Sequence, residues 1–250
     1  MTDQVVLITG TGRGIARDAA LTLGADGWRV AALDINTDGA RATAEEIKSH
    51  GGQSIALSAD ILDENQVQAA VDKTVEAWGR VDVLINAAGG YGQAFRATHE
   101  TPLDEWNRVL GSNLTGYFLC AKHVLPHMMS QGSGRIINFA SNAGRSVSPL
   151  LGASYTTAKT GVIGLTRHLA HEYGKHGIRV NTLAPGPVDS ERVSELVESE
   201  DTKDALASQI PLGRLAQTDD VVKVLQFMVS DASNYMSGAI LDVNGGYVLA

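Results

Sequence analysis

The stretch "VVLITGTGRGIA", residues 5–16, decides the fold that this sequence predicts. A short apolar run ends at Thr9 and passes at once into a turn with three glycines, Gly10, Gly12 and Gly14. An amphipathic pattern follows the turn. This order is typical of the first strand, turn and helix of a dinucleotide-binding βαβ unit. Ile15 occupies the last position of the usual G-x-G-x-x-G spacing, so the turn alone does not identify the site.

The rest of the chain repeats this alternation of short apolar runs and longer helical patterns. Near-continuous apolar strands are expected when helices cover both faces of a parallel sheet. The sequence therefore predicts a Rossmann-type, doubly wound α/β fold with a seven-stranded parallel sheet. No linker divides the chain, so we predict a single domain over residues 1–250, with a polar, acidic lid at about 187–216. The predicted strands lie within 4–9, 28–34, 53–60, 81–86, 134–141, 178–185 and 239–246.

The composition excludes several classes of protein. A formal net charge of -8 over 250 residues argues against general binding to nucleic acid or to an anionic membrane. Cys120 is the only cysteine, so no internal disulfide is possible. The histidines lack the ligand spacing and the carboxylates of a metal site, and we predict none. The first residues lack the basic start of a secretion signal, and no apolar run approaches a membrane span, so we expect a cytoplasmic protein.

The cofactor prediction depends on Asp34, which closes the second apolar run twenty residues after Gly14. A carboxylate at this place binds the adenosine ribose hydroxyls and repels a 2′-phosphate, which favours NAD over NADP. Arg13 is the counter-argument, because a guanidinium here could pair with a 2′-phosphate. The next residues, Ile35 and Asn36, supply no second cation. We therefore predict NAD.

A possible proton-transfer pair lies in "YTTAK", residues 155–159. Tyr155 and Lys159 are four residues apart and share one helix face. A free tyrosine has a pKa of about 10, and a nearby ammonium favours the phenolate and lowers that pKa. Ser141, at the end of the fifth apolar run, could donate to a substrate oxygen. Asn113 interrupts a helical pattern in which asparagine is a poor choice. Taken singly, each of these residues can be explained without catalysis, as a packed side chain, a helix cap or a solvated side chain.

Six motifs in this order resemble the short-chain dehydrogenase/reductase family over essentially the whole chain. They are "TGTGRGIA" (9–16), "NAAG" (86–89), Asn113, "IINFAS" (136–141), "YTTAK" (155–159) and "RVNTLAPGPV" (179–188). The resemblance implies a catalytic tetrad of Asn113, Ser141, Tyr155 and Lys159. It also implies that Asn113 holds a water that links Lys159 to solvent, and that Lys159 binds the nicotinamide ribose. Members of the family are usually homotetramers, so we expect one here.

The resemblance also implies a set of cofactor contacts around the first turn and the ends of the strands. Asp60 resembles the family acid that contacts the adenine amino group, and Val188 and Ser190 resemble residues near the carboxamide. Asn86 is expected to stabilise the sheet, and Ala87 stands where the family usually has a second asparagine. The predicted cofactor residues are Gly10, Gly12, Arg13, Gly14, Ile15, Asp34, Asp60, Ile61, Asn86, Ala87, Ala88, Gly89, Tyr155, Lys159, Pro185, Gly186, Val188 and Ser190.

The resulting prediction is an NAD-dependent oxidoreductase that interconverts a secondary alcohol, or a sugar or hydroxy-acid hydroxyl, and its ketone. One alternative is an NADP-dependent 3-oxoacyl-(acyl-carrier-protein) reductase, because "IPLGRLAQTDDV" (210–221) resembles that group. A second is a non-catalytic regulator that senses NAD.

Substrate specificity is expected from three loops, at 90–100, 142–153 and 187–210. Each loop carries one arginine, so an anionic substrate is a hypothesis. Alternatively, these arginines are solvated or pair with Glu100, Glu191 or Glu195. The three arginines are Arg96, Arg145 and Arg192.

Overall fold

A seven-stranded sheet forms the centre of the molecule, whose computed structural model describes residues 3–191 and 200–249. The strand order is β3-β2-β1-β4-β5-β6-β7, and all neighbouring strands are parallel. The predicted fold class is therefore confirmed. The strands are β1 (Val5–Thr9), β2 (Arg29–Asp34), β3 (Gln53–Ser58), β4 (Val83–Asn86), β5 (Gly134–Phe139), β6 (Ile178–Pro185) and β7 (Ile240–Val243).

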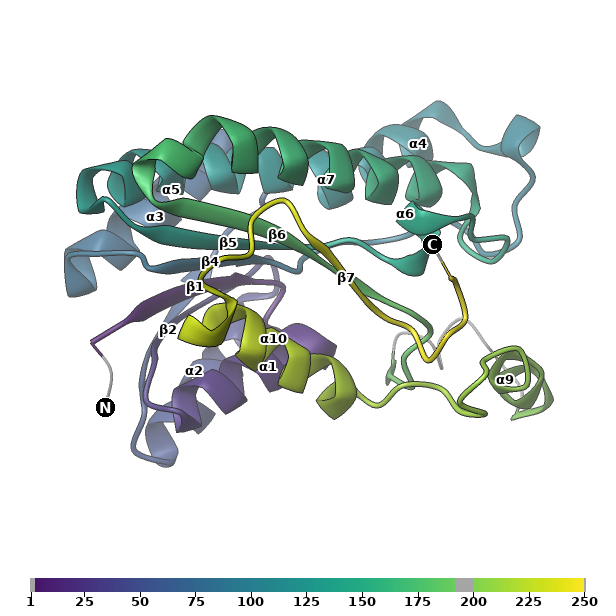
Figure 1. The fold of residues 1–250 in the computed structure, drawn as a ribbon, viewed down its shortest axis with the longest axis horizontal. Coiled ribbons are helices and arrows are strands. Elements are labelled where there is room, and N and C mark those ends of the chain that lie inside the picture. Colours follow the sequence, from purple (N-terminus) through teal and green to yellow (C-terminus); the bar gives the residue numbers. More distant parts are fainter. Residues whose placement is uncertain (1–2, 192–199, 250) are drawn as a thin grey trace.

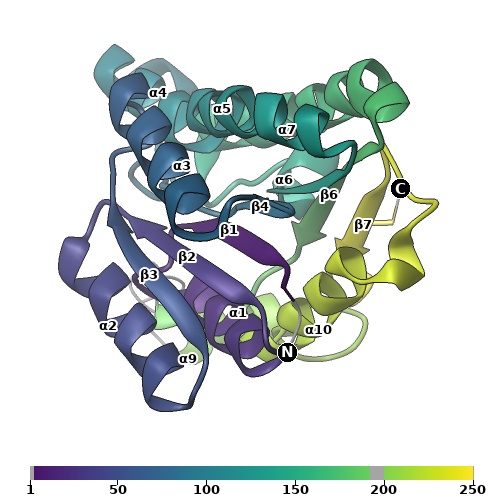
Figure 2. The ribbon, with the colours of Figure 1, turned by 90° about the vertical axis from the view of Figure 1, so that its left-hand side faces the viewer.

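Helices cover both faces of the sheet, as Figures 1 and 2 show. One face carries α1 (Gly14–Ala25), α2 (Thr37–Ser49) and α10 (Thr218–Val229), and the other carries α3 (Glu64–Trp78), α5 (Gly116–Gln131) and α7 (Gly152–Tyr173). A separate hydrophobic core lies on each face of the sheet. In β1, Val6 and Ile8 belong to one core and Leu7 belongs to the other. Successive side chains of a strand point to opposite faces, so a strand buried on both sides must be apolar throughout.

The long helical pattern near 102–132 is divided in the structure. Helix α4 (Leu103–Leu110) ends at a π-helical turn, η2 (Gly111–Thr115), and α5 follows. Asn113 lies in this turn and donates through Nδ2 to the carbonyls of Val109, at 2.9 Å, and Gly90, at 2.6 Å. The side-chain amide competes with the helix for a backbone acceptor, which explains the interruption. The remaining short elements are η1 (Thr98–Glu100), α6 (Asn142–Arg145), η3 (Gly174–His176), α9 (Glu200–Ala207) and η4 (Asp231–Ser233).

The direction in which strands are added reverses between β1 and β4, which lie side by side at the middle of the sheet. Ligands of doubly wound sheets bind in the crevice beyond the carboxyl ends of the strands at this point. The segments that leave β1, β4, β5 and β6 all begin at this edge. Residues that are up to 176 positions apart, from Gly10 to Gly186, are thereby gathered at one edge.

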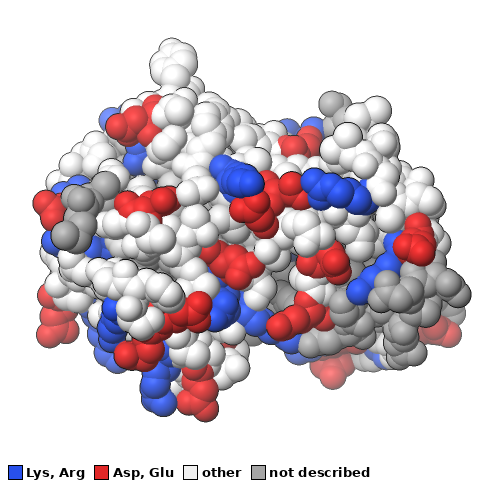
Figure 3. Space-filling view, turned by 90° about the horizontal axis from the view of Figure 1, so that it is seen from below, with Lys and Arg blue, Asp and Glu red and all other residues white. Residues whose placement is uncertain are grey.

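The surface carries mixed charge. On the face in Figure 3, acidic and basic side chains are interspersed. Several charged side chains of the protein pair within one helix. Examples are Arg41 with Asp38, Lys48 with Glu45, and Lys223 with Asp219. Among the described residues, no helix has the length and apolar character needed to cross a membrane.

Replacing Gly10 with alanine should destabilise the fold. Gly10 has φ +85°, and a Cβ there would lie 2.8 Å from the Cα of Ala88 and 2.9 Å from its nitrogen. We expect a loss of about 2–4 kcal/mol in the free energy of unfolding, from backbone strain and overpacking together. Denaturant titration would measure it. Gly51 also has φ +85° but no atom within 4 Å of a Cβ, so Gly51→Ala is the matched control. Equal losses in the two variants would contradict the role of the contact with Ala88.

Candidate active site

The glycine turn is tied to the exit of β4. Thr9 accepts hydrogen bonds through Oγ1 from the backbone nitrogens of Ala87 and Ala88, both at 3.1 Å. Helix α1 begins directly after the turn, with Arg13 at the N-cap, no side-chain cap bond and no acidic residue in its first turn. A helix start of this kind directs backbone N–H groups and a partial positive charge at an anion. The turn therefore fits the pyrophosphate of a dinucleotide.

The carboxylate of Asp34 lies against this turn. Its Oδ2 accepts from the nitrogen of Gly12 at 2.7 Å, and its Oδ1 accepts from the nitrogen of Asn36 at 2.8 Å. Asn36 caps α2 by accepting from Gly39 at 3.2 Å. Asp34 is thus free of a capping role and holds a negative charge beside the turn, where the adenosine ribose of a dinucleotide would lie.

Asn86 ties the central strands together below the site. It is fully buried, and its Nδ2 donates to Oδ1 of Asn138 on β5 at 2.9 Å and to the carbonyl of Tyr117 at 3.3 Å. Asn138 in turn donates to Oγ1 of Thr166 on α7 at 2.9 Å. These buried amides join β4, β5, α5 and α7, which is the structural role expected of Asn86.

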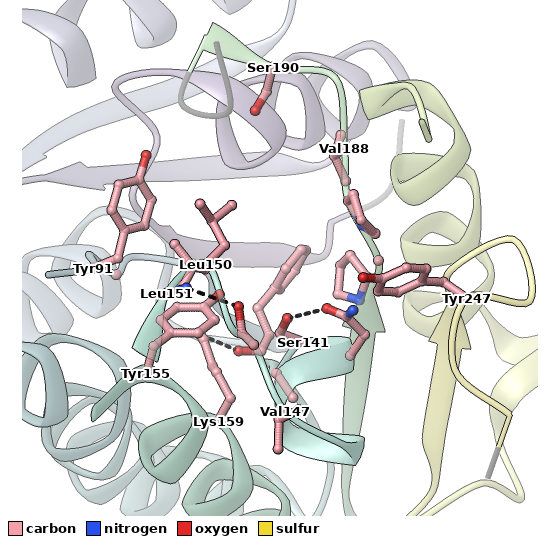
Figure 4. A pocket seen from close by; sticks show the side chains of 18 of the residues that line it. Tyr91, Ser141, Val147, Leu150, Leu151, Tyr155, Lys159, Val188, Ser190 and Tyr247 are labelled. Atoms are coloured by element: carbon pink, nitrogen blue, oxygen red, sulfur yellow. Dashed lines mark hydrogen bonds between the residues drawn. The ribbon is translucent and has the colours of Figure 1, made fainter. Parts of the chain in front are cut away.

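Four predicted catalytic residues line one cavity of about 530 Å³ at the open edge of the sheet. Tyr155 and Lys159 project from α7, Ser141 is the N-cap of α6, and Asn113 comes from the π-helical turn. Figure 4 shows Tyr155, Ser141 and Lys159 in this cavity. The structure therefore brings together residues from three separate parts of the chain.

Lys159 is held at the bottom of the cavity between two phenol rings. It is 3% exposed, and its Nζ donates to the carbonyl of Phe139 at 2.7 Å and to the hydroxyl of Tyr117 at 3.3 Å. Nζ lies 5.6 Å from the ring centroid of Tyr155 and 5.1 Å from that of Tyr117. An ammonium in a buried place needs such acceptors and electron-rich ring faces.

Tyr117 is a site residue that sequence reasoning missed. It is fully buried, and in the sequence it belongs to an apolar run, "YFLC", that reads as core. Only the packing of α5 against α7 shows that its hydroxyl meets Lys159.

Ser141 and Asn113 are held by local hydrogen bonds. Ser141 donates through Oγ to Oδ1 of Asn142 at 2.9 Å and accepts from the nitrogen of Ala143 at 3.1 Å. A substrate oxygen in the cavity would compete with Asn142 for the Ser141 proton. Asn113 is buried, and a Cβ on Gly89 would collide with its amide, so glycine at position 89 allows the β4 loop to lie against it.

Comparisons with known proteins show the family to which the chain is related. A family model described as enoyl-(acyl carrier protein) reductase matches residues 10–248. The chain is 40% identical to a cis-4-hydroxycyclohexanecarboxylate dehydrogenase from Sinomonas cyclohexanicum, over 78% of this chain and 77% of that protein. It is 38% identical to a 3-oxoacyl-(acyl-carrier-protein) reductase from Staphylococcus aureus, over 96% of each. A short-chain type dehydrogenase/reductase from Mycobacterium marinum has a similar solved structure, with a TM-score of 0.93, 31% identity and coverage of 99% and 96%.

The chain belongs to the short-chain dehydrogenase/reductase family. It is an NAD(P)-dependent oxidoreductase that acts on CH–OH groups and the corresponding carbonyls. The predicted family and enzyme class are confirmed.

Three loops of this short-chain dehydrogenase/reductase line the cavity, and they are those expected to carry specificity. The first contributes Gly90, Tyr91 and Phe95, the second Asn142 and residues 147–151, and the third Pro187, Val188, Ser190, Ala205, Leu206 and Gln209. Tyr247, close to the carboxyl end of the chain, also lines it and was not predicted. Figure 4 shows Tyr247 entering from the side opposite Tyr155, with Ser141 between them.

The cavity also includes several of the residues predicted to bind the cofactor. Ile15, Ala87, Gly89, Pro185, Gly186, Val188 and Ser190 line it. Val188 also forms a parallel bridge with Ala216, which anchors the start of the 187–216 segment.

Asp60 and Ile61 follow β3 and lie in a loop that Asp60 organises. The Asp60 Oδ1 accepts from the nitrogen of Leu62 at 2.9 Å, and the Asp60 nitrogen donates to Gln66 at 3.0 Å. Ile61 is buried and packs over Gly116. Their contact with adenine stays a prediction.

The arginines predicted to bind an anionic substrate do not line the cavity where they are described. Arg96 donates to Glu105 at 3.0 Å and also bonds Gln93. The Nε of Arg145 lies 3.3 Å from Oδ1 of Asp242 on β7, close enough for an ion pair but not aligned for a hydrogen bond. These partners differ from those predicted, because the fold brings α4 and β7 next to the two loops. Arg192 lies outside the described residues.

The described residues contain no group of three histidine, cysteine, aspartate or glutamate side chains that could hold a metal ion.

Proposed function

We propose that this protein is an NAD-dependent dehydrogenase that interconverts a secondary alcohol and its ketone. The observation that supports this proposal is that Tyr155, Lys159 and Ser141 line one cavity at the carboxyl edge of the sheet, next to the glycine turn. NAD, when bound, supplies the hydride acceptor or donor for such a reaction. The rest of the chemistry is proton transfer and orientation by the chain.

The residues present fit this cofactor. The turn with Gly10, Gly12 and Gly14, together with the start of α1, would hold the pyrophosphate. Asp34 would accept from the ribose hydroxyls near adenine, and Asp60 and Ile61 would face the adenine. Residues of the β4 and β6 exits, with Val188 and Ser190, would hold the nicotinamide end.

Tyr155 would move the proton. In alcohol oxidation, the C–H bond breaks with its electron pair as hydride, and the O–H proton passes to Oη of the ionised Tyr155. The positive charge of Lys159 near that ring favours the phenolate. Ser141 would orient the substrate oxygen by a hydrogen bond. Ketone reduction runs the same steps backward, with Tyr155 as the acid.

Asp34 supports NAD rather than NADP. A 2′-phosphate would meet a carboxylate that two backbone N–H groups already hold in place. The main alternative is the NADP-dependent 3-oxoacyl-(acyl-carrier-protein) reductase, which the Staphylococcus aureus relative favours. A regulator that senses NAD is the second alternative, although it would have no use for a buried lysine beside Tyr155.

A substrate screen tests the proposal. Secondary alcohols with NAD, and their ketones with NADH, would be followed by the absorbance of NADH. The same panel with NADP and NADPH, and a 3-oxoacyl thioester, would be run beside it. Turnover of the thioester with NADPH alone would favour the carrier-protein alternative, and no turnover in any arm would favour the regulator.

Removing the hydroxyl of Tyr117 should slow the reaction without unfolding the site. Tyr117→Phe keeps the ring over Lys159 but removes one acceptor of its ammonium. Losing a hydrogen bond to a charged group costs about 1.5 kcal/mol or more, so we expect kcat to fall about tenfold. With less support for the ammonium, the rising limb of the pH profile for alcohol oxidation should move to higher pH. Stopped assays across pH would measure both, and an unchanged profile would assign Tyr117 to packing alone.

Three further parts of the proposal concern the oligomeric state, the lid and the location of the protein. We expect a homotetramer with contacts on the helices near 103–131 and 153–176 and on the last strand. In support, Phe118 and Met129 on α5 are 48% and 40% exposed and lie on one side of the helix. Light scattering would measure the oligomeric state. The lid role of 187–216 and a cytoplasmic location also stay predictions.

A further inference from the structure

Phe95 has an unusual backbone conformation at the mouth of the cavity. Among the described residues other than glycine, it alone has positive φ, at +58°. A bulky side chain in this left-handed region is a true outlier, and such strain persists only where the surroundings hold it. Its nitrogen donates to the carbonyl of Leu150 at 2.9 Å, which joins the first specificity loop to the second.

Packing does not account for an aromatic residue at this strained position. Phe95 is 69% exposed, so its ring is mostly in contact with water, although it lines the cavity. Glycine or asparagine would adopt the same backbone conformation with less strain. The chain instead presents a phenyl ring to whatever enters the cavity.

The side chains around Phe95 make the mouth apolar. Val147, which is 64% exposed, and Leu150, Leu151 and Leu206 line the same cavity. We call these residues with Phe95 the apolar mouth. Tyr247 lines the cavity as well, with its hydroxyl 3.3 Å from Gln209.

Charge is scarce in the cavity. Of the lining residues that the structure describes, only Lys159 is charged, and its Nζ is already bonded to Phe139 and Tyr117. Arg96 and Arg145 are paired with acids outside it. A substrate carboxylate that moved from water into the cavity would therefore find no described cation to pair with. Burying an unpaired charge in this way is costly.

We infer that the apolar mouth binds the uncharged, apolar body of the alcohol or ketone, and that Phe95 is a specificity-determining residue. This inference rests on the proposed function and names its substrate class. It separates this chain from a dehydrogenase of hydroxycyclohexane carboxylates, the activity named for the Sinomonas cyclohexanicum relative.

A pair of related substrates tests the charge. 4-Methylcyclohexanol and 4-hydroxycyclohexanecarboxylate share the ring and the hydroxyl and differ in a methyl group against a carboxylate. We expect kcat/KM to be at least about tenfold higher for the methyl compound. Equal values, or a preference for the carboxylate, would overturn the inference.

The result remains separable from the proposed function. If neither compound turns over with NAD or NADP, the substrate screen described above decides the proposed function. Calorimetric binding of the same two compounds to the nucleotide-saturated protein would still decide the substrate class. The methyl compound should then bind at least about tenfold more tightly, and tighter binding of the carboxylate would overturn the inference.

Two variants test Phe95 itself. In Phe95→Gly and Phe95→Asn, the ratio of kcat/KM for 4-methylcyclohexanol to that for 2-propanol should fall about tenfold, because only the larger substrate reaches the mouth. The melting temperature should stay equal or rise, because both residues relieve the strain. Leu103, which is 72% exposed on α4 and does not line the cavity, gives the control Leu103→Ala, with an unchanged ratio. A lower melting temperature with an unchanged ratio would show that Phe95 is structural.

Discussion

Replacing Tyr155 with phenylalanine should lower kcat for alcohol oxidation by about a thousandfold and leave nucleotide binding nearly unchanged. The substitution removes only the hydroxyl that takes the proton, and general acid–base catalysis contributes roughly 10² to 10⁴ in rate. The ring, its place on α7 and its distance to Lys159 are kept. Steady-state kinetics would measure the loss, and the shift of melting temperature with NAD would measure binding.

Tyr173 offers a matched control for this experiment. It lies at the other end of the same helix and does not line the cavity. Tyr173→Phe removes a hydroxyl of the same kind, and we expect kcat within about twofold of the parent, because the reacting atoms are untouched. Near-normal turnover in Tyr155→Phe would contradict the proton-transfer role. If both variants lack turnover but still give an NAD-dependent response of a partner, the result would favour the regulator.

Neutralising Asp34 should produce the largest change in cofactor choice. We expect the parent protein to prefer NAD over NADP by about 10²-fold or more, since juxtaposed like charges cost several kcal/mol. In Asp34→Asn, the repulsion is gone while an acceptor oxygen remains for one of the two N–H groups, of Gly12 and Asn36. The preference should shrink to within about tenfold. The ratio of kcat/KM for the two nucleotides would measure it.

Asp38 supplies the control for the charge change. It is an exposed carboxylate in the first turn of α2, paired with Arg41, and its side chain is 91% exposed. Asp38→Asn should leave the nucleotide ratio within about twofold, because exposed charges at a distance are screened by salt. A parent protein that prefers NADP would contradict the NAD proposal and favour the carrier-protein reductase. Equal shifts in both variants would show a general effect of net charge.

The fold could be predicted from the sequence because its determinants are local. The apolar run of β1 and the glycines after it require a buried strand followed by a tight turn, whatever the rest of the chain does. The same holds for the spacing of Tyr155 and Lys159 on α7. These features depend on backbone conformation and on periodicity, which neighbouring residues set.

The surroundings of the site were beyond sequence reasoning because they depend on contacts between distant segments. Tyr117 reads as a core residue and becomes a partner of Lys159 only when α5 packs against α7. Arg96 and Arg145 read as substrate ligands, and the fold gives them Glu105 and Asp242 instead. The partner of a side chain depends on three-dimensional proximity. Arg145 and Asp242 are 97 residues apart in the sequence, and nothing in the sequence indicates that they pair.

By itself, the sequence determined a parallel α/β sheet with a dinucleotide turn, and it marked Asn113, Ser141, Tyr155 and Lys159 as residues with chemistry to perform. Only the tertiary structure decided that these residues share one cavity and that the described arginines stand outside it. It alone revealed the strained Phe95 at an apolar mouth. The physical reason is that local patterns specify backbone and burial, whereas a binding surface is built from loops that meet only after the sheet has formed.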